Sequence, residues 1–172
     1  PGTGKSVVSL WRHISNYKNG KKSLLLTYAT TLARYLQACC ATQEANASKN
    51  VGRAYKNKPS FGSHWNEIII DEAQDLETGY FDDIKNNGKV TYGADDSQIV
   101  YPDKSTKQAE LRKIYRDNIE YVLDKNYRST LKIMEFAHCA FPDAIIYKNT
   151  LDELAKRNIG VQPVLLISKK NK

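Results

Sequence analysis

The sequence predicts an α/β fold with a mostly parallel sheet and flanking helices. Short apolar runs that end in polar residues alternate with longer segments in which apolar residues recur at helical spacing. This alternation of strands and helices is typical of a parallel sheet. The chain has 172 residues, of which 41% are hydrophobic, so it suffices for one domain, or for one domain and part of a second.

The first half of the chain predicts three elements and a long connection. Apolar residues at positions 7, 10, 11 and 14 share one face of a helix, and we expect Trp11 on this face to lie in the core. Asn19-Gly20 ends the helix, residues 23–27 form a short buried strand, and a second helix covers residues 32–40. The polar stretch 41–66 is predicted to be a connection that is too short for a domain of its own.

The second half continues the alternation of strands and helices. Residues 67–71 form the clearest strand, because an isoleucine triplet is bounded by acidic residues. Ser105 is predicted to cap a helix whose apolar residues include Leu111 and Ile114. The other predicted elements are, in order, a helix at 80–84, a turn at 86–88, strands at 89–93 and 119–123, helices at 133–141 and 151–157, and a strand at 164–167.

Composition and charge exclude several classes of protein. The longest apolar runs are far shorter than the roughly 18 residues of a membrane helix, so we predict no membrane partner. Three cysteines without a CxxC pair, and no secretory signal, favour a reducing compartment, and we expect a cytoplasmic protein. The three histidines have no metal-ligand spacing. The net charge of +7 fits a polyanionic partner such as nucleic acid, although solubility explains it equally well.

The first six residues, Pro-Gly-Thr-Gly-Lys-Ser, match the second half of the phosphate-binding pattern G-x-x-x-x-G-K-[ST]. Glycines allow backbone N–H groups to converge on phosphate oxygens, and the N-terminus of the following helix favours negative charge. We therefore predict nucleotide contacts from Gly2, Thr3, Gly4, Lys5 and Ser6, with Lys5 at the β- and γ-phosphates and the Ser6 hydroxyl on Mg²⁺. The alternative is an ordinary glycine-rich turn that caps a helix.

Two acidic residues follow the isoleucine strand and predict the second half of a nucleotide site. Asp71 lies at the carboxyl end of the strand, where open parallel sheets bind ligands, and is predicted to hold Mg²⁺ through water. Glu72 is predicted to orient and deprotonate the attacking water, a contribution of about 10²–10⁴-fold to the rate. The alternative is that both acids only cap the next helix.

Four motifs occur together in one order along the chain. They are Pro-Gly-Thr-Gly-Lys-Ser at 1–6, Asp-Glu-Ala-Gln-Asp at 71–75, Gly-Ala-Asp-Asp-Ser-Gln at 93–98 and Asn-Tyr-Arg-Ser at 126–129. With these motifs the chain resembles superfamily 1 DNA helicases of the UvrD/Rep type, from residue 1 to about residue 140. A phosphate-binding loop alone would be generic, whereas the second and fourth motifs together are specific to this group.

The resemblance implies a RecA-like P-loop NTPase fold whose first, P-loop strand precedes Pro1. Residues 1–116 would be most of the first RecA-like domain, and residues 117–172 the start of the second. The implied activity is ATP hydrolysis with Mg²⁺, coupled to movement on single-stranded DNA, with RNA left open. Motifs V and VI would lie in the remainder of a parent chain, so we expect the isolated chain to be a weak or inactive ATPase.

The resemblance also assigns roles by position. Gln98 matches the glutamine that senses the γ-phosphate, although the motif here reads Asp-Ser-Gln where the family has Asp-Gln-Ser. Tyr127 matches the tyrosine that stacks on adenine, and Arg128 matches the arginine that reaches the γ-phosphate between two RecA-like domains. The alternatives are a glutamine in a surface turn and an arginine on the surface.

A contact with single-stranded DNA is implied at two places. Thr27 and Tyr28 lie where the family has its motif Ia, at the end of a strand; capping of the next helix by Thr30 or Thr31 is an equal alternative. Tyr101, just after the third motif, is predicted to stack on a base, with packing in the core or in a loop as the alternative.

Two other functions are considered. The first is a nucleotide-gated switch that binds DNA or a partner protein without unwinding, which the short polar stretch between the first two motifs favours. The second is a small-molecule kinase. It is disfavoured, because Glu72 beside Asp71, with Gln98 and Arg128, suits activation of water better than positioning of a substrate hydroxyl.

Overall fold

The chain forms two compact units, which we describe separately. The computed structural model describes residues 2–142, 148–157 and 159–164. The first unit contains residues 3–121, and the second contains Gly2 and residues from 122 onward.

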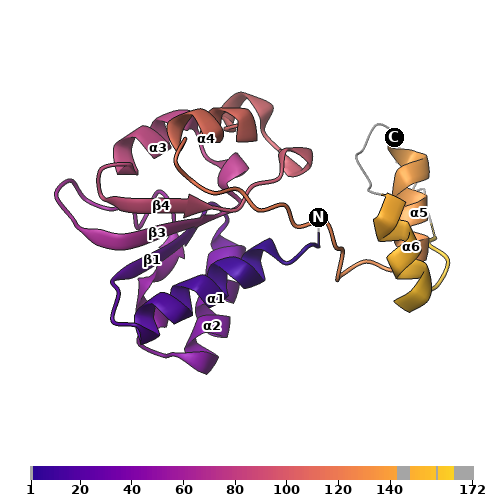
Figure 1. Cartoon of the computed structure of the whole chain (residues 1–172), viewed down its shortest axis with the longest axis horizontal. Coiled ribbons are helices and arrows are strands. Elements are labelled where there is room, and N and C mark those ends of the chain that lie inside the picture. The colour runs from indigo at the N-terminus through magenta and orange to yellow at the C-terminus, as the bar shows by residue number, and fades with distance from the viewer. Residues whose placement is uncertain (1, 143–147, 158, 165–172) are drawn as a thin grey trace, which may run out of the picture. The chain divides into compact units, whose positions relative to one another are not determined.

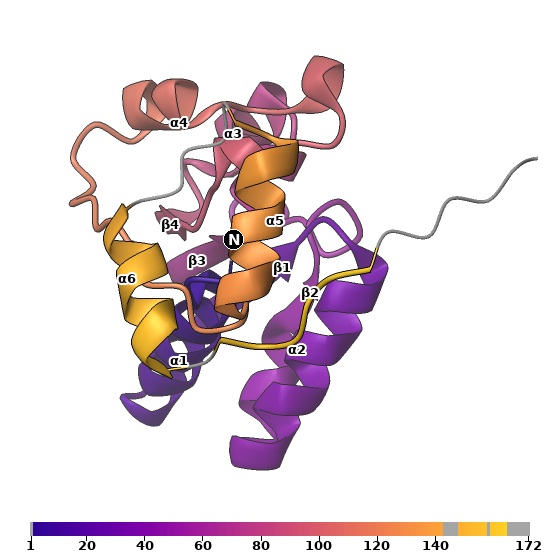
Figure 2. The same ribbon diagram turned by 90° about the vertical axis from the view of Figure 1, so that its right-hand side faces the viewer.

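The first unit contains a four-stranded sheet in which every strand pair is parallel. The strands are β1 (Ser23–Thr27), β2 (Val51–Arg53), β3 (Trp65–Asp71) and β4 (Gly88–Tyr92). Their order across the sheet is β2-β1-β3-β4, as Figure 2 shows. The predicted α/β fold with a parallel sheet is confirmed, and β1, β3 and β4 lie where the sequence predicted strands.

Helices cover both faces of this sheet (Figure 1). Helices α1 (Lys5–Lys18) and α2 (Thr30–Gln43) lie on one face, and α3 (Thr78–Ile84) and α4 (Gln108–Ile114) lie on the other. Because both faces are covered, β1 and β3 are apolar along their length, and each buried leucine or isoleucine contributes about 1.5–3 kcal/mol. Short 3₁₀ turns at Ala47–Asn50, Ala73–Asp75, Asp96–Gln98 and Pro102–Lys104 complete the first unit's helices.

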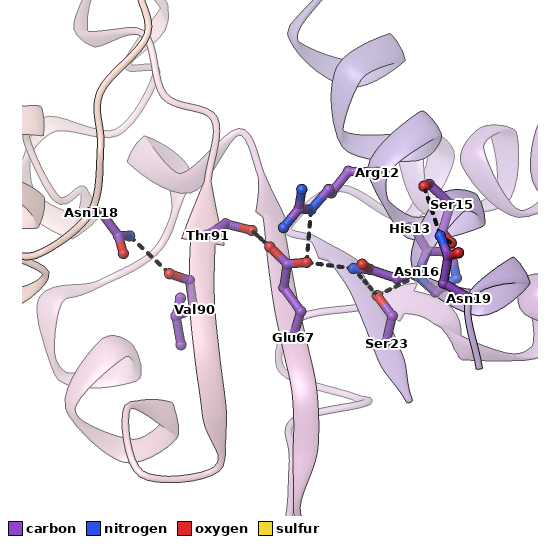
Figure 3. Close-up of polar contacts among 10 residues, drawn as sticks. All are labelled: Arg12, His13, Ser15, Asn16, Asn19, Ser23, Glu67, Val90, Thr91 and Asn118. Carbon is purple, nitrogen blue, oxygen red and sulfur yellow. Dashed lines mark hydrogen bonds and ion pairs between the residues drawn. The ribbon is translucent and has the colours of Figure 1, made fainter. Parts of the chain in front are cut away.

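A buried polar network lies between α1 and the sheet (Figure 3). The Glu67 carboxylate accepts hydrogen bonds from Arg12 Nε at 2.9 Å, from Thr91 Oγ1 at 3.0 Å and from the Asn16 amide. Ser23 bonds both to Asn16 and to His13 Nδ1, the latter at 3.0 Å. Burial raises the pKa of Glu67, but the hydrogen bonds outweigh burial and hold this pKa below its ordinary value.

The predicted core position of Trp11 is wrong. Its side chain is 70% exposed, and Val7 and Val8 beside it are exposed too. Helix α1 instead buries Ser9, His13, Ile14 and Asn16. The physical reason is that the sheet presents Ser23, Glu67 and Asp71 to α1, so the polar face of the helix turns inward.

Three further predictions differ from the structure. Residues 119–123 are irregular and exposed instead of forming a strand. The helix predicted to start at Ser105 begins at Gln108, with Lys107 as its N-cap. The polar stretch 41–66 contains β2, which the sequence did not predict. Of the strand predicted at 164–167, only Val164 is among the described residues.

The second unit contains two helices, α5 (Leu131–Ala140) and α6 (Lys148–Arg157), which pack against each other (Figure 2). The Thr130 hydroxyl accepts a hydrogen bond from the Ile133 N–H and so caps α5. Lys132 N donates to the Ile159 carbonyl at 3.0 Å and ties α5 to the segment after α6. Both predicted helices of this region are confirmed.

In the part of the chain that the structure describes, every helix is too short or too polar to span a bilayer.

Candidate functional site

The N-terminus of α1 is suited to an anion. Gly4 is its N-cap, with a φ of 94°, a left-handed conformation that glycine adopts without strain. Among the described residues, neither an acidic side chain in the first turn nor a capping side chain compensates the positive end of the helix dipole. The first helical residue, Lys5, adds a further positive charge at this end. An anion bound here would therefore be favoured by the backbone N–H groups and by the charge.

The Lys5 ammonium lies between two carboxylates. Lys5 Nζ is 3.5 Å from Asp95 Oδ2 and 3.9 Å from Glu72 Oε1. Glu72 follows β3 and Asp95 follows β4, so both acids come from the carboxyl end of the sheet. The Lys5 side chain is only 13% exposed. Both contacts are looser than a short charged hydrogen bond, which leaves the ammonium able to turn to a stronger anion.

Asp71 lies at the same end of the sheet as Lys5. A Cβ atom on Gly93 would be 3.6 Å from Lys5 Cβ and 3.7 Å from Asp71 Oδ1, so both residues flank Gly93. Asp71 is fully buried, and Ser9 Oγ donates to its Oδ1 at 3.1 Å. Within the described part of the chain, its second oxygen, Oδ2, is buried without a hydrogen-bond partner.

Burial raises the pKa of Asp71, and the negative charge of Glu72 adds to the effect, whereas the nearby hydroxyls of Ser6 and Ser9 oppose it. An ionised carboxylate in this position is costly unless a cation or a donor meets its free oxygen. The geometry therefore provides a buried acidic oxygen beside the N-terminus of α1.

Thr27 is paired with Asp71 in the register of β1 and β3 and projects to the same face. It is 1% exposed, and its Oγ1 is also buried without a partner among the described residues. Because its side chain is buried, Thr27 offers no surface to a polymer. Two unpartnered buried polar atoms at neighbouring strand ends mark this edge as a place for polar ligands or water.

Glu72 has an unusual backbone conformation, with φ 55° and ψ 52°. It is the only non-glycine residue with positive φ in the part of the chain that the structure describes. A left-handed conformation costs a residue with a side chain roughly 1–2 kcal/mol, and such strain is concentrated at functional sites. The strained position aims the Glu72 side chain at Lys5.

The loop after β4 brings Gln98 to the same place. Asp95 accepts hydrogen bonds from Ser97 N at 3.1 Å and from Gln98 Nε2 at 2.6 Å. Burial alone would raise the pKa of Asp95, but these hydrogen bonds outweigh it and hold the pKa well below its ordinary value. Gln98 is thus bonded to the carboxylate that pairs with Lys5.

The residues present fit a Mg²⁺ ion. The Ser6 hydroxyl lies near enough to Asp71 to lower the pKa of its carboxyl, so a hydroxyl and a carboxylate are near each other at the N-terminus of α1. Mg²⁺ prefers oxygen ligands, and it commonly uses one or two protein ligands together with water and substrate phosphates. Groups of three or more His, Cys, Asp or Glu that could hold a metal are absent from the described ranges, which is compatible with such a sparse site.

A groove of about 380 Å³ lies on the first unit, beside the carboxyl ends of β1 and β2. It contains Tyr28 and Tyr101, which are 38% and 63% exposed. The rings of Tyr28 and Tyr55 meet edge to face at 6.1 Å, which braces Tyr28. The groove is lined by Tyr28, Arg53, Tyr55, Asp75, Glu77, Tyr101, Lys104 and Ser105.

One alternative for motif Ia differs from the structure, because the N-cap of α2 is Ala29 and neither Thr30 nor Thr31 caps this helix. Tyr101 is 63% exposed, so its side chain does not pack in the core.

The second unit carries the fourth motif. The Asn126 side-chain oxygen accepts hydrogen bonds from the backbone N–H groups of Arg128 at 2.9 Å and of Ser129 at 2.8 Å. This turn leaves the side chains of Tyr127 and Arg128 exposed. Their roles at adenine and the γ-phosphate stay predictions.

Sequence reasoning missed several residues of the site. Gln74 and Asp95 belong to motifs that were recognised, but the motif patterns gave them no role. Arg53 and Tyr55 lie in the polar stretch, where no periodicity or motif identified them. Gln74 and Asp95 are identified by their hydrogen bonds and ion pair in the site, and Arg53 and Tyr55 by their place in the groove, all of which only the fold provides.

Comparison with protein-family models finds no match for this chain, and comparison with curated proteins finds none either.

Proposed function

We propose that this chain binds and hydrolyses ATP with Mg²⁺, as a RecA-like motor segment that acts on single-stranded nucleic acid. The observation that carries the proposal is the meeting of Lys5, Asp71 and Glu72 around the N-terminus of α1, although they are far apart in the sequence. The preference for adenine and for DNA rests on the resemblance to superfamily 1 helicases.

The glycine turn and Lys5 would bind the phosphates. Backbone N–H groups of the turn point at the anion, and the dipole of α1 favours it. Lys5 would leave Asp95 and Glu72 for the β- and γ-phosphates, since a triphosphate carries more charge than either carboxylate. The ion pairs in the free protein thus keep the ammonium positioned before the nucleotide arrives.

Ser6 and Asp71 would hold the Mg²⁺ ion, which neutralises charge on the phosphates when bound. The unpartnered Oδ2 of Asp71 is the atom that most needs a cation or a water beside it. Ser9 would keep the other oxygen of Asp71 in place through its hydrogen bond.

Glu72 would act as the general base. Its carboxylate takes a proton from a water molecule, the water oxygen forms a bond to the γ-phosphorus, and the bond from that phosphorus to the bridging oxygen of ADP breaks. ADP and inorganic phosphate then leave, and Glu72 returns its proton to solvent. Gln98, which is bonded to Asp95, would respond to the γ-phosphate.

The groove lined by Tyr28 and Tyr101 is the proposed nucleic-acid surface. Exposed tyrosine rings offer stacking platforms to unpaired bases, and Arg53 and Lys104 supply positive charge for the backbone. Asp75 and Glu77 make the groove less basic than a purely electrostatic site. We therefore expect stacking to contribute more than phosphate contacts.

Replacing Lys5 with alanine is expected to weaken ATP binding by about 10- to 100-fold, because charged hydrogen bonds to phosphate contribute about 1.5–3 kcal/mol. Titration with a fluorescent ATP analogue in the presence of Mg²⁺ measures this change. Lys18→Ala, which removes the same charge at the other end of α1, is the matched control and should bind normally. Equal affinity of the Lys5→Ala variant would overturn the proposed site.

Replacing Tyr28 or Tyr101 with alanine is expected to weaken binding of a single-stranded oligonucleotide by about 5- to 150-fold, since stacking contributes about 1–3 kcal/mol per base. The corresponding phenylalanine variants keep the ring and should retain binding. Phe61→Ala, an exposed aromatic outside the groove, serves as a second control. Fluorescence anisotropy at two salt concentrations gives the affinities; unchanged affinity of both alanine variants would exclude the groove.

A strand-displacement assay on a partial duplex separates a motor from a nucleotide-gated switch. Displacement that depends on ATP supports the motor, whereas ATP turnover stimulated by the oligonucleotide without displacement supports the switch.

A further inference from the structure

We propose that Gln74 is a positioning residue that holds the Glu72 carboxylate in place for hydrolysis. The inference rests on the proposed function and extends it to a residue that neither the motifs nor the resemblance assigned.

The Gln74 side-chain amide bridges two segments of the site. Its Nε2 donates to Glu72 Oε2 at 2.8 Å, and its Oε1 accepts from the Asp95 backbone N–H at 3.0 Å. The side chain is 1% exposed, so water does not compete for these bonds. Gln74 therefore links the segment after β3, which carries the base, to the loop after β4.

The bridge makes the two Glu72 oxygens different. Oε2 is bound by Gln74, while Oε1 faces Lys5 at 3.9 Å. When Lys5 turns to the phosphates, Oε1 becomes free to accept a proton and Oε2 stays fixed. A carboxylate held at one oxygen presents the other in a defined direction, which is what a general base requires.

Gln74 is itself held in place by hydrogen bonds to two other segments. Its own backbone carbonyl accepts from Thr106 N at 3.2 Å, and the Asp95 N–H belongs to the loop that carries the partner of Lys5. The backbone bond survives a change of side chain at position 74. A substitution at position 74 therefore removes the contact with Glu72, while the hydrogen bond from Thr106 N still holds the backbone.

Two substitutions separate the contacts of the amide. Gln74→Glu keeps the shape and can still accept from the Asp95 N–H, but it cannot donate to Glu72. Gln74→Met has a similar volume and loses both bonds. Gln43→Met, on the exposed end of α2, is the matched control.

Single-turnover hydrolysis of ATP, with the full chain in excess, gives the maximal rate and the half-saturating concentration. Both Gln74 variants are expected to lower the maximal rate by about 10–100-fold and to change the half-saturating concentration by less than about twofold, a loss typical of residues that orient a reacting group. Gln43→Met should match the unchanged chain. If the Gln74→Met variant does not fold, the single-turnover rate of the Gln74→Glu variant tests the inference alone.

A double substitution distinguishes positioning from a general structural role. In a Glu72→Gln background, Gln74→Met is expected to cause no further loss of rate, because the group that it positions is already absent. A further loss by the same factor as in the unchanged background would overturn the inference.

Failure of the proposed function is distinguishable from failure of this inference. ATP binding that is absent, or equal in the Lys5→Ala variant, overturns the ATPase proposal together with the role of Gln74. Turnover that depends on Lys5 but is unchanged in both Gln74 variants overturns the inference alone.

Discussion

Replacing Glu72 with glutamine is expected to lower the maximal rate of ATP hydrolysis by about 10²–10⁴-fold, the usual contribution of a general base. Glutamine has nearly the same shape as glutamate, but its amide cannot take a proton from water. Lys5 and the glycine turn are unchanged, so ATP affinity is expected to stay within about twofold. The loss thus falls on the rate and not on binding.

Single-turnover hydrolysis and equilibrium binding on the same preparation measure both quantities. Asp82→Asn is the matched control, because Asp82 is an exposed acid in an ion pair with Lys85 and loses the same charge. Its rate should equal that of the unchanged chain. Normal turnover by the Glu72→Gln variant would show that another group activates the water.

The strands differ in how far the sequence alone could predict them. Strands β1 and β3 are buried on both faces, so each reads as a continuous apolar run. Strand β2 has only three residues, and it is a strand because Val51 pairs with Leu25 of β1. No pattern in the local sequence of Val51–Arg53 indicates that this segment pairs with β1.

Helix α1 illustrates the limit of hydrophobic periodicity. The spacing of Val7, Trp11 and Ile14 predicts the helix correctly, but of these three side chains only Ile14 is buried. The sheet beneath α1 carries Glu67 and Ser23, and the helix meets them with His13 and Asn16 (Figure 3). Which face a helix buries depends on the surface opposite, and the helix's own sequence does not contain that surface.

For the candidate site, the sequence predicted the meeting of distant residues but not its details. A parallel sheet places all carboxyl ends at one edge, so Lys5 and Asp71 were expected to lie close together. The pairing of Lys5 with Asp95, the left-handed backbone of Glu72 and the bridge made by Gln74 depend on loop conformations. These conformations follow from tertiary contacts that no motif specifies.

Replacing Asp71 with asparagine is expected to stabilise the fold and to remove the effect of Mg²⁺ on ATP binding. The buried carboxylate has one unpartnered oxygen, and burial raises its pKa, so its negative charge opposes folding at neutral pH. Asparagine removes that charge and keeps an acceptor for Ser9, which should raise the free energy of unfolding by about 1 kcal/mol. The loss of a ligand should weaken the Mg²⁺-dependent part of ATP binding by at least about 10-fold.

The pH dependence of this stabilisation follows from the direction of the Asp71 shift. The native pKa lies above the ordinary value of 3.8, so the folded state binds more protons than the unfolded state between these two values. Lowering the pH through this window protonates native Asp71 and relieves its cost. The advantage of the Asp71→Asn variant, measured by urea unfolding, should therefore be largest at neutral pH and shrink towards pH 3.8.

Glu67→Gln provides a matched control on the same strand and the same face of the sheet. Glu67 is equally buried, but its oxygens are bonded to Arg12, Asn16 and Thr91, and its pKa is lowered. Its substitution should therefore destabilise the fold, by about 1–3 kcal/mol, and leave the effect of Mg²⁺ intact. If Asp71→Asn raises the free energy of unfolding and Glu67→Gln lowers it, the Asp71 carboxylate serves a ligand and the Glu67 carboxylate serves the fold. Destabilisation by both substitutions would make Asp71 an ordinary structural residue.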